Sequence, residues 1–176
     1  MKIIEAAQAM IDSGAYRETQ GPNRSPAIDA LAREFGVPLG SPWCAMFACK
    51  AAETARDSGE DGDAFPMTAG SQDLLHKLTA MGCQTSLTAQ SLLSWKGAAV
   101  IRTDPDGAHG HVALVKERLT DASGIITAIV TCEGNTDVLG SSNGDGAYNR
   151  HRWIPLAPYK WTFVRLDGLA GGDWWG

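Results

Sequence analysis

Residues 41–47 read SPWCAMF, and this stretch predicts the start of a helix with a cysteine in its first turn. Ser41 is a typical N-cap residue because its hydroxyl can accept a hydrogen bond from an unpaired backbone N–H. Pro42 suits the first helical position, where no N–H donor is needed. Cys44 then falls at the third helical position, where unpaired N–H groups and the helix dipole favour a thiolate over a thiol. The stretch therefore indicates a nucleophile, if the chain also supplies a base.

The chain outward from this stretch changes its hydrophobic period halfway along. Apolar residues at helical spacing predict helices over 3–13, 26–35, 42–56 and 71–81. Short apolar runs bounded by turn residues predict strands over 98–102, 111–117, 125–132 and 161–166. Helices followed by antiparallel strands indicate an α+β fold, with N-terminal helices packed against a C-terminal antiparallel sheet. The length fits a single domain over residues 1–176.

The composition excludes several classes of protein. A net charge of −5 argues against a nucleic-acid-binding protein, which would carry a basic patch. No stretch approaches the roughly 20 apolar residues of a membrane span. Residues 1–10 lack the apolar core of a signal peptide, so export by the general secretory route is not expected. The cysteines other than Cys44 have no zinc-site spacing and are expected to be small buried core residues.

The second half of the chain offers a base and groups to orient it. His111 begins a predicted strand directly after Gly110, whose lack of a side chain leaves room for another chain to approach. Glu133 and Asn135 are two residues apart, so both point the same way if the strand continues through Gly134. A nucleophilic cysteine needs a base within hydrogen-bond reach and a third group that orients the base. Cys44, His111, Glu133 and Asn135 are therefore the candidate catalytic residues.

Three segments in this order resemble the CHAP family, the cysteine, histidine-dependent amidohydrolases/peptidases that cut bacterial peptidoglycan. They are SPWCAMF at 41–47, GHVALV at 110–115 and EGNT at 133–136. The run from 140 to 148 and on to Arg152 looks like the loop and following strand of a CHAP subgroup. Asn23-Arg24 and the helix at 71–82 also stand where that subgroup has comparable segments. The resemblance covers about residues 23–165.

The resemblance implies a role for each candidate. Cys44 would be the nucleophile and His111 the base, with Glu133 orienting His111. Asn135 would support the imidazole or polarise the substrate. The implied fold is papain-like, and the implied substrate is a peptidoglycan amide. That amide lies either within the stem peptide or between the sugar lactyl group and the first alanine, and the sequence does not choose between an endopeptidase and an N-acetylmuramoyl-L-alanine amidase.

The sequence also departs from related patterns. Papain-like proteases often place a glutamine about six residues before the cysteine to bind the oxyanion, and Pro38 stands there in this chain. The backbone N–H of Cys44 remains a donor candidate. Some phage CHAP domains carry an acidic calcium loop ahead of the cysteine. In this chain residues 35–41 contain no carboxylate, so no calcium is expected there. No cofactor or metal is expected elsewhere.

Two other functions remain open. His109 and His111 form a His-Gly-His pair that could bind zinc in a metal-dependent wall hydrolase, although a third ligand is not recognisable. A non-catalytic wall-binding module on a CHAP-like scaffold is the other alternative. His109 otherwise fits a solvated loop residue near the cleft, and Trp43 either packs or forms a cleft wall. Both are the substrate-binding candidates.

The remaining expectations concern surfaces and partners. The basic run 150–152 is expected to be a solvated strand face, and the aromatic tail at Trp174 and Trp175 to fold back onto the domain. The chain is expected to act as a monomer on peptidoglycan. Because no export signal is visible, a phage lysis system, a tail-associated particle or a secretion machine would have to deliver it. A secreted toxin would imply a cognate immunity protein.

Overall fold

A computed structural model describes residues 2–59, 65–95, 97–137, 144–156, 159–166 and 169. Four helices come first, namely α1 (Ile3–Asp12), α2 (Pro26–Glu34), α3 (Cys44–Asp57) and α4 (Ser71–Ala80). The short strand β1 (Thr85–Ser86) and the 3-10 helix η1 (Ala89–Leu93) lead into the sheet. The other strands are β2 (Ala98–Thr103), β3 (Gly110–Thr120), β4 (Ile126–Thr136), β5 (Gly146–Trp153) and β6 (Lys160–Arg165). The chain is α+β, which confirms the predicted class.

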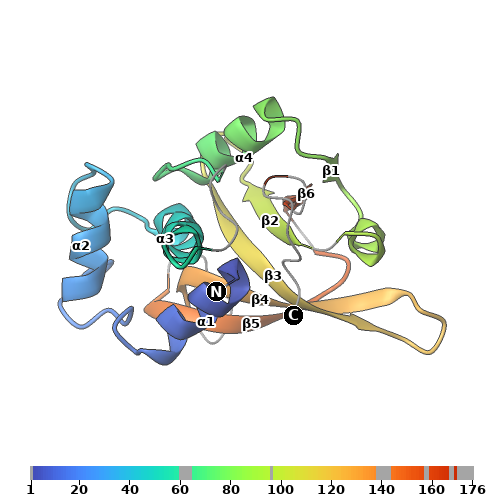
Figure 1. Ribbon diagram of the computed structural model, residues 1–176, viewed down its shortest axis with the longest axis horizontal. Coiled ribbons are helices and arrows are strands. Elements are labelled where there is room, and N and C mark those ends of the chain that lie inside the picture. The colour runs from blue at the N-terminus through green and yellow to red at the C-terminus, as the bar shows by residue number, and fades with distance from the viewer. Residues whose placement is uncertain are drawn as a thin grey trace.

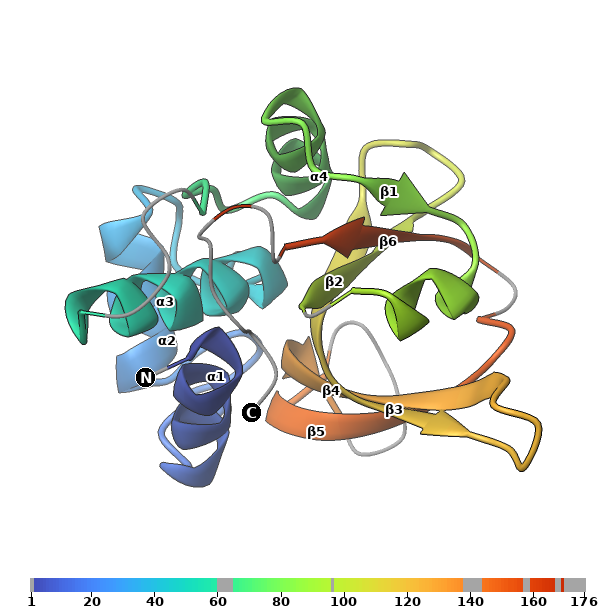
Figure 2. The same cartoon turned by 45° about the vertical axis from the view of Figure 1, so that its right-hand side comes forward.

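The strands form one antiparallel sheet in the order β1-β6-β2-β3-β4-β5. Figures 1 and 2 show α1, α2 and α3 gathered on one side of this sheet, with α4 beside β2. The N-terminal end of α3 thus lies near the strands at the middle of the sheet. This arrangement brings the cysteine helix to the strands that carry His111 and Glu133.

The predicted strands are found, but the sheet is larger than the sequence indicated. β2, β3, β4 and β6 correspond to the four predicted apolar runs. β3 and β4 each extend into a hairpin whose outer residues 117–125 are exposed, so no apolar run marks them. β5 also lacks an apolar run, because its residues alternate between buried or half-buried and exposed positions. It was indicated only by the family resemblance and by the basic run.

Two hydrophobic clusters hold the fold together. One joins the helices to the sheet and includes Ile3, Met46 and Leu114. The other lies among η1, β2, β3, β4 and β6 and includes Leu92, Trp95, Val115 and Phe163. Because both faces of the central strands are covered, side chains at β3 positions of either parity are buried. A polar side chain placed there needs a partner within the protein.

The start of the cysteine helix differs from the prediction. α3 begins at Cys44 itself, and Trp43 occupies the N-cap position without a side-chain cap. Ser41 does not cap the helix, because its hydroxyl donates to the carbonyl of Pro38 at 2.7 Å within a tight turn. The second helix follows its prediction more closely, since Ser25 caps it and Pro26 is its first residue. Cys44 is therefore the first helical residue rather than the third.

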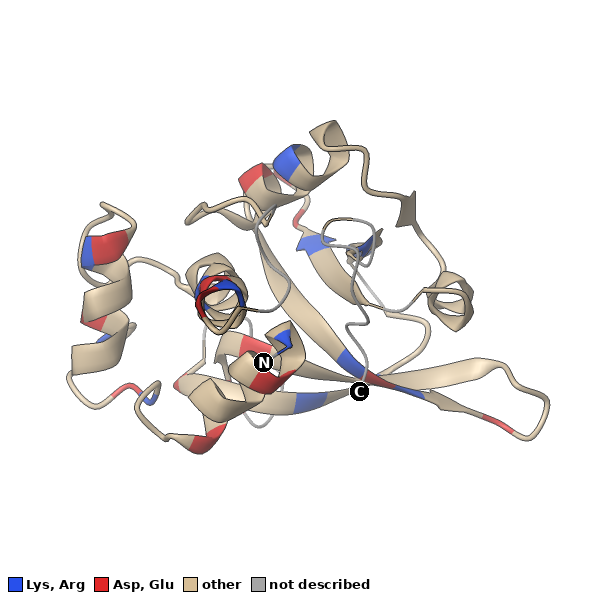
Figure 3. Cartoon of the chain, viewed as in Figure 1, with Lys and Arg blue, Asp and Glu red and all other residues tan. Residues whose placement is uncertain are grey.

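Charged residues are distributed over most elements, and Figure 3 shows basic positions interspersed with acidic ones on the helices. Among the described residues, no helix is long and apolar enough to cross a membrane. The tail 171–176, with Trp174 and Trp175, lies outside the described residues, as do positions 140–143 of the segment that resembles a CHAP loop. Their predicted conformations stay predictions.

Candidate active site

Cys44 lines a cleft at the N-terminal end of α3. The residue is 6% exposed and lines a cavity of about 550 Å³. As the first residue of the helix, its own backbone N–H has no partner within the helix. The backbone N–H groups of Ala45 and Val112 point to its sulfur. The helix start therefore supplies a donor to the thiol, as predicted, and β3 supplies a second one, although the position of Cys44 in the helix differs by two residues.

The four cysteines differ sharply in acidity. Burial acts to raise the pKa of the Cys44 thiol, but His111 and the backbone N–H groups outweigh it, so the pKa is lowered. Burial raises the pKa of Cys49 and of Cys132 to about 12 and also raises the pKa of Cys83. No disulfide joins them. Cys49 and Cys132 are fully buried and Cys83 is half-buried, so the prediction of core thiols holds fully for the first two. Only Cys44 has an environment that favours the thiolate.

His111 connects the thiol to a buried carboxylate. Its side chain is fully buried, and its Nε2 lies 2.8 Å from Oε2 of Glu133. Nδ1 is the ring nitrogen left for Cys44. Nδ1 makes no hydrogen bond to a described residue, and Cys44 and His111 act on each other electrostatically, each favouring the charged form of the other. Burial acts to lower the pKa of His111, but Cys44 and Glu133 raise it to about 9.

Gly110 makes this position of His111 possible. A Cβ atom at residue 110 would collide with the backbone carbonyl oxygen of Arg102 and with the side-chain amide of Gln72. That amide in turn donates to the Arg102 carbonyl at 2.7 Å and so ties α4 to β2. The predicted close approach at Gly110 is therefore confirmed.

Glu133 is the most heavily bonded side chain of the site. It is fully buried, and it accepts hydrogen bonds from the hydroxyl of Thr131 and from the guanidinium of Arg152. Burial acts to raise the pKa of this carboxyl, but His111 and Arg152 outweigh it and hold the pKa far below its usual range. Glu133 thus stays ionised beside the imidazole, which fixes the ring orientation.

Arg152 was not predicted as part of this group. The sequence indicated a solvated strand face over 150–152, and that prediction is wrong for Arg152, whose side chain is 13% exposed and bound to Glu133. A signal was present: a carboxylate placed in a buried strand needs a cation. The alternation of β5 then offers Arg150 and Arg152 on one face. The sequence could not choose between them without the pairing register.

Asn135 lies in the same cleft, but the strand does not run straight from Glu133 to it. The β4–β5 pairing shifts register between Glu133 and Thr136, and Asn135 has a φ of 56°. The strand continues through Gly134 as expected, but the irregular pairing and the positive φ mean that strand alternation alone does not fix the direction of the Asn135 side chain. Asn135 is 1% exposed and lines the cleft beside Cys44. Its Oδ1 is buried without a hydrogen-bond partner among the described residues.

Trp43 does not line the cleft. Its side chain is fully buried and packs against Tyr16 and Phe47, with ring centroids 6.2 and 6.3 Å away. Gly134 passes so closely that a Cβ there would lie 2.7 Å from the indole. The predicted role of Trp43 in substrate binding is therefore replaced by a packing role. The indole packs against the strand that carries Glu133.

His109 lies at the rim of the cleft, away from His111. Its Nδ1 pairs with Oδ2 of Asp106 at 2.5 Å, and the side chain is 78% exposed. The hydrogen bond that the His109 ring donates to the Asp106 carboxylate raises the pKa of His109. The two histidines thus have different carboxylate partners. No third histidine, cysteine or carboxylate joins them in a metal-binding cluster within the described ranges.

The cleft wall combines polar and apolar groups. It carries an ion pair between Arg102 and Asp104, with Nε 2.7 Å from Oδ1. The lining comes from five separate segments of the chain, namely Asn23, Val37, Ser41, Pro42, Cys44, Ala69, Gly70, Ser71, Arg102, Asp104, Ala108, His109, Gly110 and Asn135. A cleft of this size can hold a segment of a peptide or a small ligand.

Comparison with models of known protein families, with curated proteins and with solved structures gives no match.

Proposed function

We propose that this protein is a cysteine hydrolase that cleaves an amide bond of peptidoglycan. The observation that carries the chemistry is the pairing of Cys44, which lines the cleft, with the buried His111. A lowered pKa at Cys44 and raised pKa values at the other three cysteines single out one nucleophile. The substrate class comes from the resemblance of three sequence segments to the CHAP family. The papain-like arrangement belongs to the same proposal, since a cysteine on a helix start faces a histidine on an antiparallel strand.

The reaction follows from the protonation state of the pair. The Cys44 thiolate attacks the amide carbonyl carbon, and a C–S bond forms as the carbonyl oxygen becomes an oxyanion. His111 gives its proton to the leaving nitrogen, and the C–N bond breaks. A water molecule then loses a proton to His111 and attacks the thioester carbonyl carbon, so that a C–O bond forms and the C–S bond breaks. The products are a carboxylic acid, an amine and the regenerated thiolate.

The oxyanion needs two donors aimed at its position. The N–H of Cys44 is the first, because it is the first residue of α3 and has no partner within the helix. The side-chain amide of Asn135 is our choice for the second, because it borders the same cleft and makes no hydrogen bond to His111. This choice assigns Asn135 to the substrate rather than to support of the imidazole.

Digestion of purified peptidoglycan, followed by mass spectrometry of the fragments, tests the proposal and identifies the bond. We expect the wild-type protein to release new amine and carboxylate termini, and Cys44→Ala to release none while keeping its fold. Cys83→Ser is the matched control, because it removes a thiol outside the cleft and should retain activity. A thiol alkylator should abolish activity and a chelator should spare it. The reverse pattern would favour zinc catalysis, and binding to sacculi without cleavage would favour a wall-binding module.

A further inference from the structure

Arg152 and Glu133 form a two-point ion pair behind the histidine. Nε of Arg152 donates to Oε1 of Glu133 at 2.6 Å, and Nη2 donates to Oε2 at 2.6 Å. The Oε2 atom is the one that also contacts His111. A bidentate guanidinium fixes both the position and the plane of the carboxylate. The carboxylate orientation seen by the imidazole is therefore set from β5.

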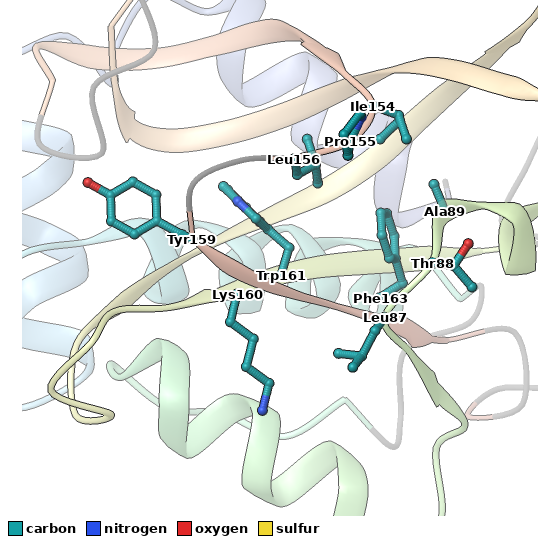
Figure 4. A pocket seen from close by; sticks show the side chains of 10 residues that line it. All are labelled: Leu87, Thr88, Ala89, Ile154, Pro155, Leu156, Tyr159, Lys160, Trp161 and Phe163. Atoms are coloured by element: carbon teal, nitrogen blue, oxygen red, sulfur yellow. The ribbon is translucent and has the colours of Figure 1, made fainter.

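The Trp161 ring also contacts the Arg152 guanidinium. The Arg152 Cζ atom lies 4.9 Å from the centroid of the Trp161 ring. Trp161 lines an apolar pocket of about 460 Å³, and Figure 4 shows it and Phe163 projecting from one side of β6 towards Ile154–Leu156. A guanidinium can stack on a ring and bind a carboxylate at two points, whereas an ammonium cannot do both. The environment is specific for arginine.

The buried group of four side chains is neutral only when Arg152 is included. With Cys44 as thiolate and His111 as imidazolium, the charges of Cys44 and His111 cancel. The charges of Glu133 and Arg152 then cancel as well. Removing Arg152 would leave one net negative charge in a largely water-excluded site, and such a site takes up a proton. The proton would go to the thiolate, which would lose its nucleophilic form.

We propose that Arg152 is a positioning residue that acts through Glu133 to keep Cys44 and His111 as a thiolate–imidazolium pair. The inference deepens the proposed function, since it concerns the resting state of the same nucleophile. It can be tested without any peptidoglycan substrate, because alkylation reports on the thiolate directly. Failure of peptidoglycan cleavage would therefore leave this test intact.

The other charged or titratable groups close to these residues have partners of their own or stay neutral. Arg102, opposite His111 on β2, pairs with Asp104. On β5, the Arg150 guanidinium donates to the backbone carbonyl of Asp137, and the Tyr148 hydroxyl donates to Asp145. The neighbouring thiols of Cys49 and Cys132, with pKa values of about 12, are uncharged near neutral pH. Arg152 is thus the cation that bonds directly to Glu133.

The test measures the rate of Cys44 alkylation by iodoacetamide as a function of pH, with the modified residue identified by mass spectrometry. In Arg152→Met the midpoint of the titration should rise by about one pH unit, and alkylation below the midpoint should slow by about 10-fold. Arg150→Met is the matched control, because it removes the same charge two residues away on the same strand face. Its midpoint should equal that of the wild type.

A double variant tests the charge balance itself. Glu133→Gln with Arg152→Met removes both charges, so its midpoint should return towards the wild-type value. A midpoint that is unchanged in folded Arg152→Met, or that moves equally in Arg150→Met, would overturn the proposal. If Arg152→Met does not fold, Arg152→Lys replaces it. Lysine keeps the charge but reaches only one carboxylate oxygen, so the midpoint should rise by a few tenths of a pH unit, and no rise would count against the proposal.

Discussion

Gly110 lies directly against the backbone carbonyl of Arg102 on the neighbouring strand. The contact leaves no room for a side chain at the residue that precedes His111. Because Arg102 pairs with His111 across the same two strands, the spacing at Gly110 also sets where the histidine stands.

Gly110→Ala should therefore disturb both the fold and the site. Overpacking of this kind costs about 1–3 kcal/mol, and here the obstructing atoms are backbone and a bonded amide. We expect a lower free energy of unfolding in urea and slower alkylation of Cys44. Gly70→Ala is the control, because a Cβ there would meet Asp73 at an ordinary distance of 3.6 Å. Equal stability losses in the two variants would show that the contact at Gly110 is not limiting.

Selective modification should distinguish the four thiols. At neutral pH, a limiting amount of iodoacetamide should modify Cys44 first, because its pKa is lowered while the pKa values of the others are raised. Thiolate character controls the rate of alkylation. Peptide mapping by mass spectrometry measures the order of modification. Cys83 is the informative competitor, because it is the most exposed of the other three cysteines. Modification of Cys83 before Cys44 would argue against an activated Cys44.

The pH dependence of hydrolysis should be bell-shaped. Activity needs the Cys44 thiolate, so it should rise as pH increases through the lowered pKa of that thiol. Activity also needs the His111 proton for the leaving amine, so it should fall as pH rises through about 9. The kcat/KM profile over pH 4–11 measures both limbs. Activity that keeps rising well beyond the His111 pKa would contradict the assignment of His111 as proton donor.

Acid should weaken the fold partly through Glu133. The pKa of this carboxyl is far lower in the folded protein than its ordinary value of 4.5. Its contribution to stability is therefore fully present above that value and is lost as pH falls below it. Between pH 6 and pH 3, the melting temperature of the double variant Glu133→Gln with Arg152→Met should fall by less than that of the wild type. Parallel curves for the two proteins would show that Glu133 does not contribute.

Trp43 should behave as a core residue. Trp43→Ala should cost about 3–5 kcal/mol of unfolding free energy, because the indole is fully buried between Tyr16, Phe47 and Gly134. Trp153→Ala is the comparison, since that indole is 68% exposed and its loss should change stability by less than about 0.5 kcal/mol. Urea denaturation measures both. A stable Trp43→Ala variant with weakened substrate binding would restore the recognition role.

The elements with strong hydrophobic periodicity could be predicted from the sequence. The helices and β2, β3, β4 and β6 follow from apolar spacing, because burial of one face or both leaves a regular pattern. β5 could not be found in this way, since its polar residues alternate between half-buried and exposed positions, and the half-buried Arg152 is satisfied by Glu133 on β4. A charged residue such as Arg152 is expected to be exposed, so its burial cannot be predicted until its partner is known.

The positions of the side chains in the site were harder to predict than which residues form it. Cys44, His111 and Glu133 come together from α3, β3 and β4, and Asn135 borders the same cleft. The helix start moved because the Ser41 hydroxyl bonds to Pro38 instead of to the helix. The position of Asn135 depends on a bulge in β4, and bulges depend on pairing with a second strand. Such tertiary choices leave little trace in one sequence.

The order of the strands determines when, during synthesis and folding, the surroundings of Cys44 are complete. The groups that lower the pKa of the thiol come from α3 and β3, Glu133 beside His111 comes from β4, and Arg152, which binds Glu133, comes from β5 at the edge of the sheet. A nascent chain that ends before β5 carries Cys44 but lacks this counter-charge. Its cysteine should react like an ordinary thiol until the sheet is complete. We therefore expect Cys44 to become reactive late in folding, and the appearance of that reactivity should mark the docking of β5 beside β4.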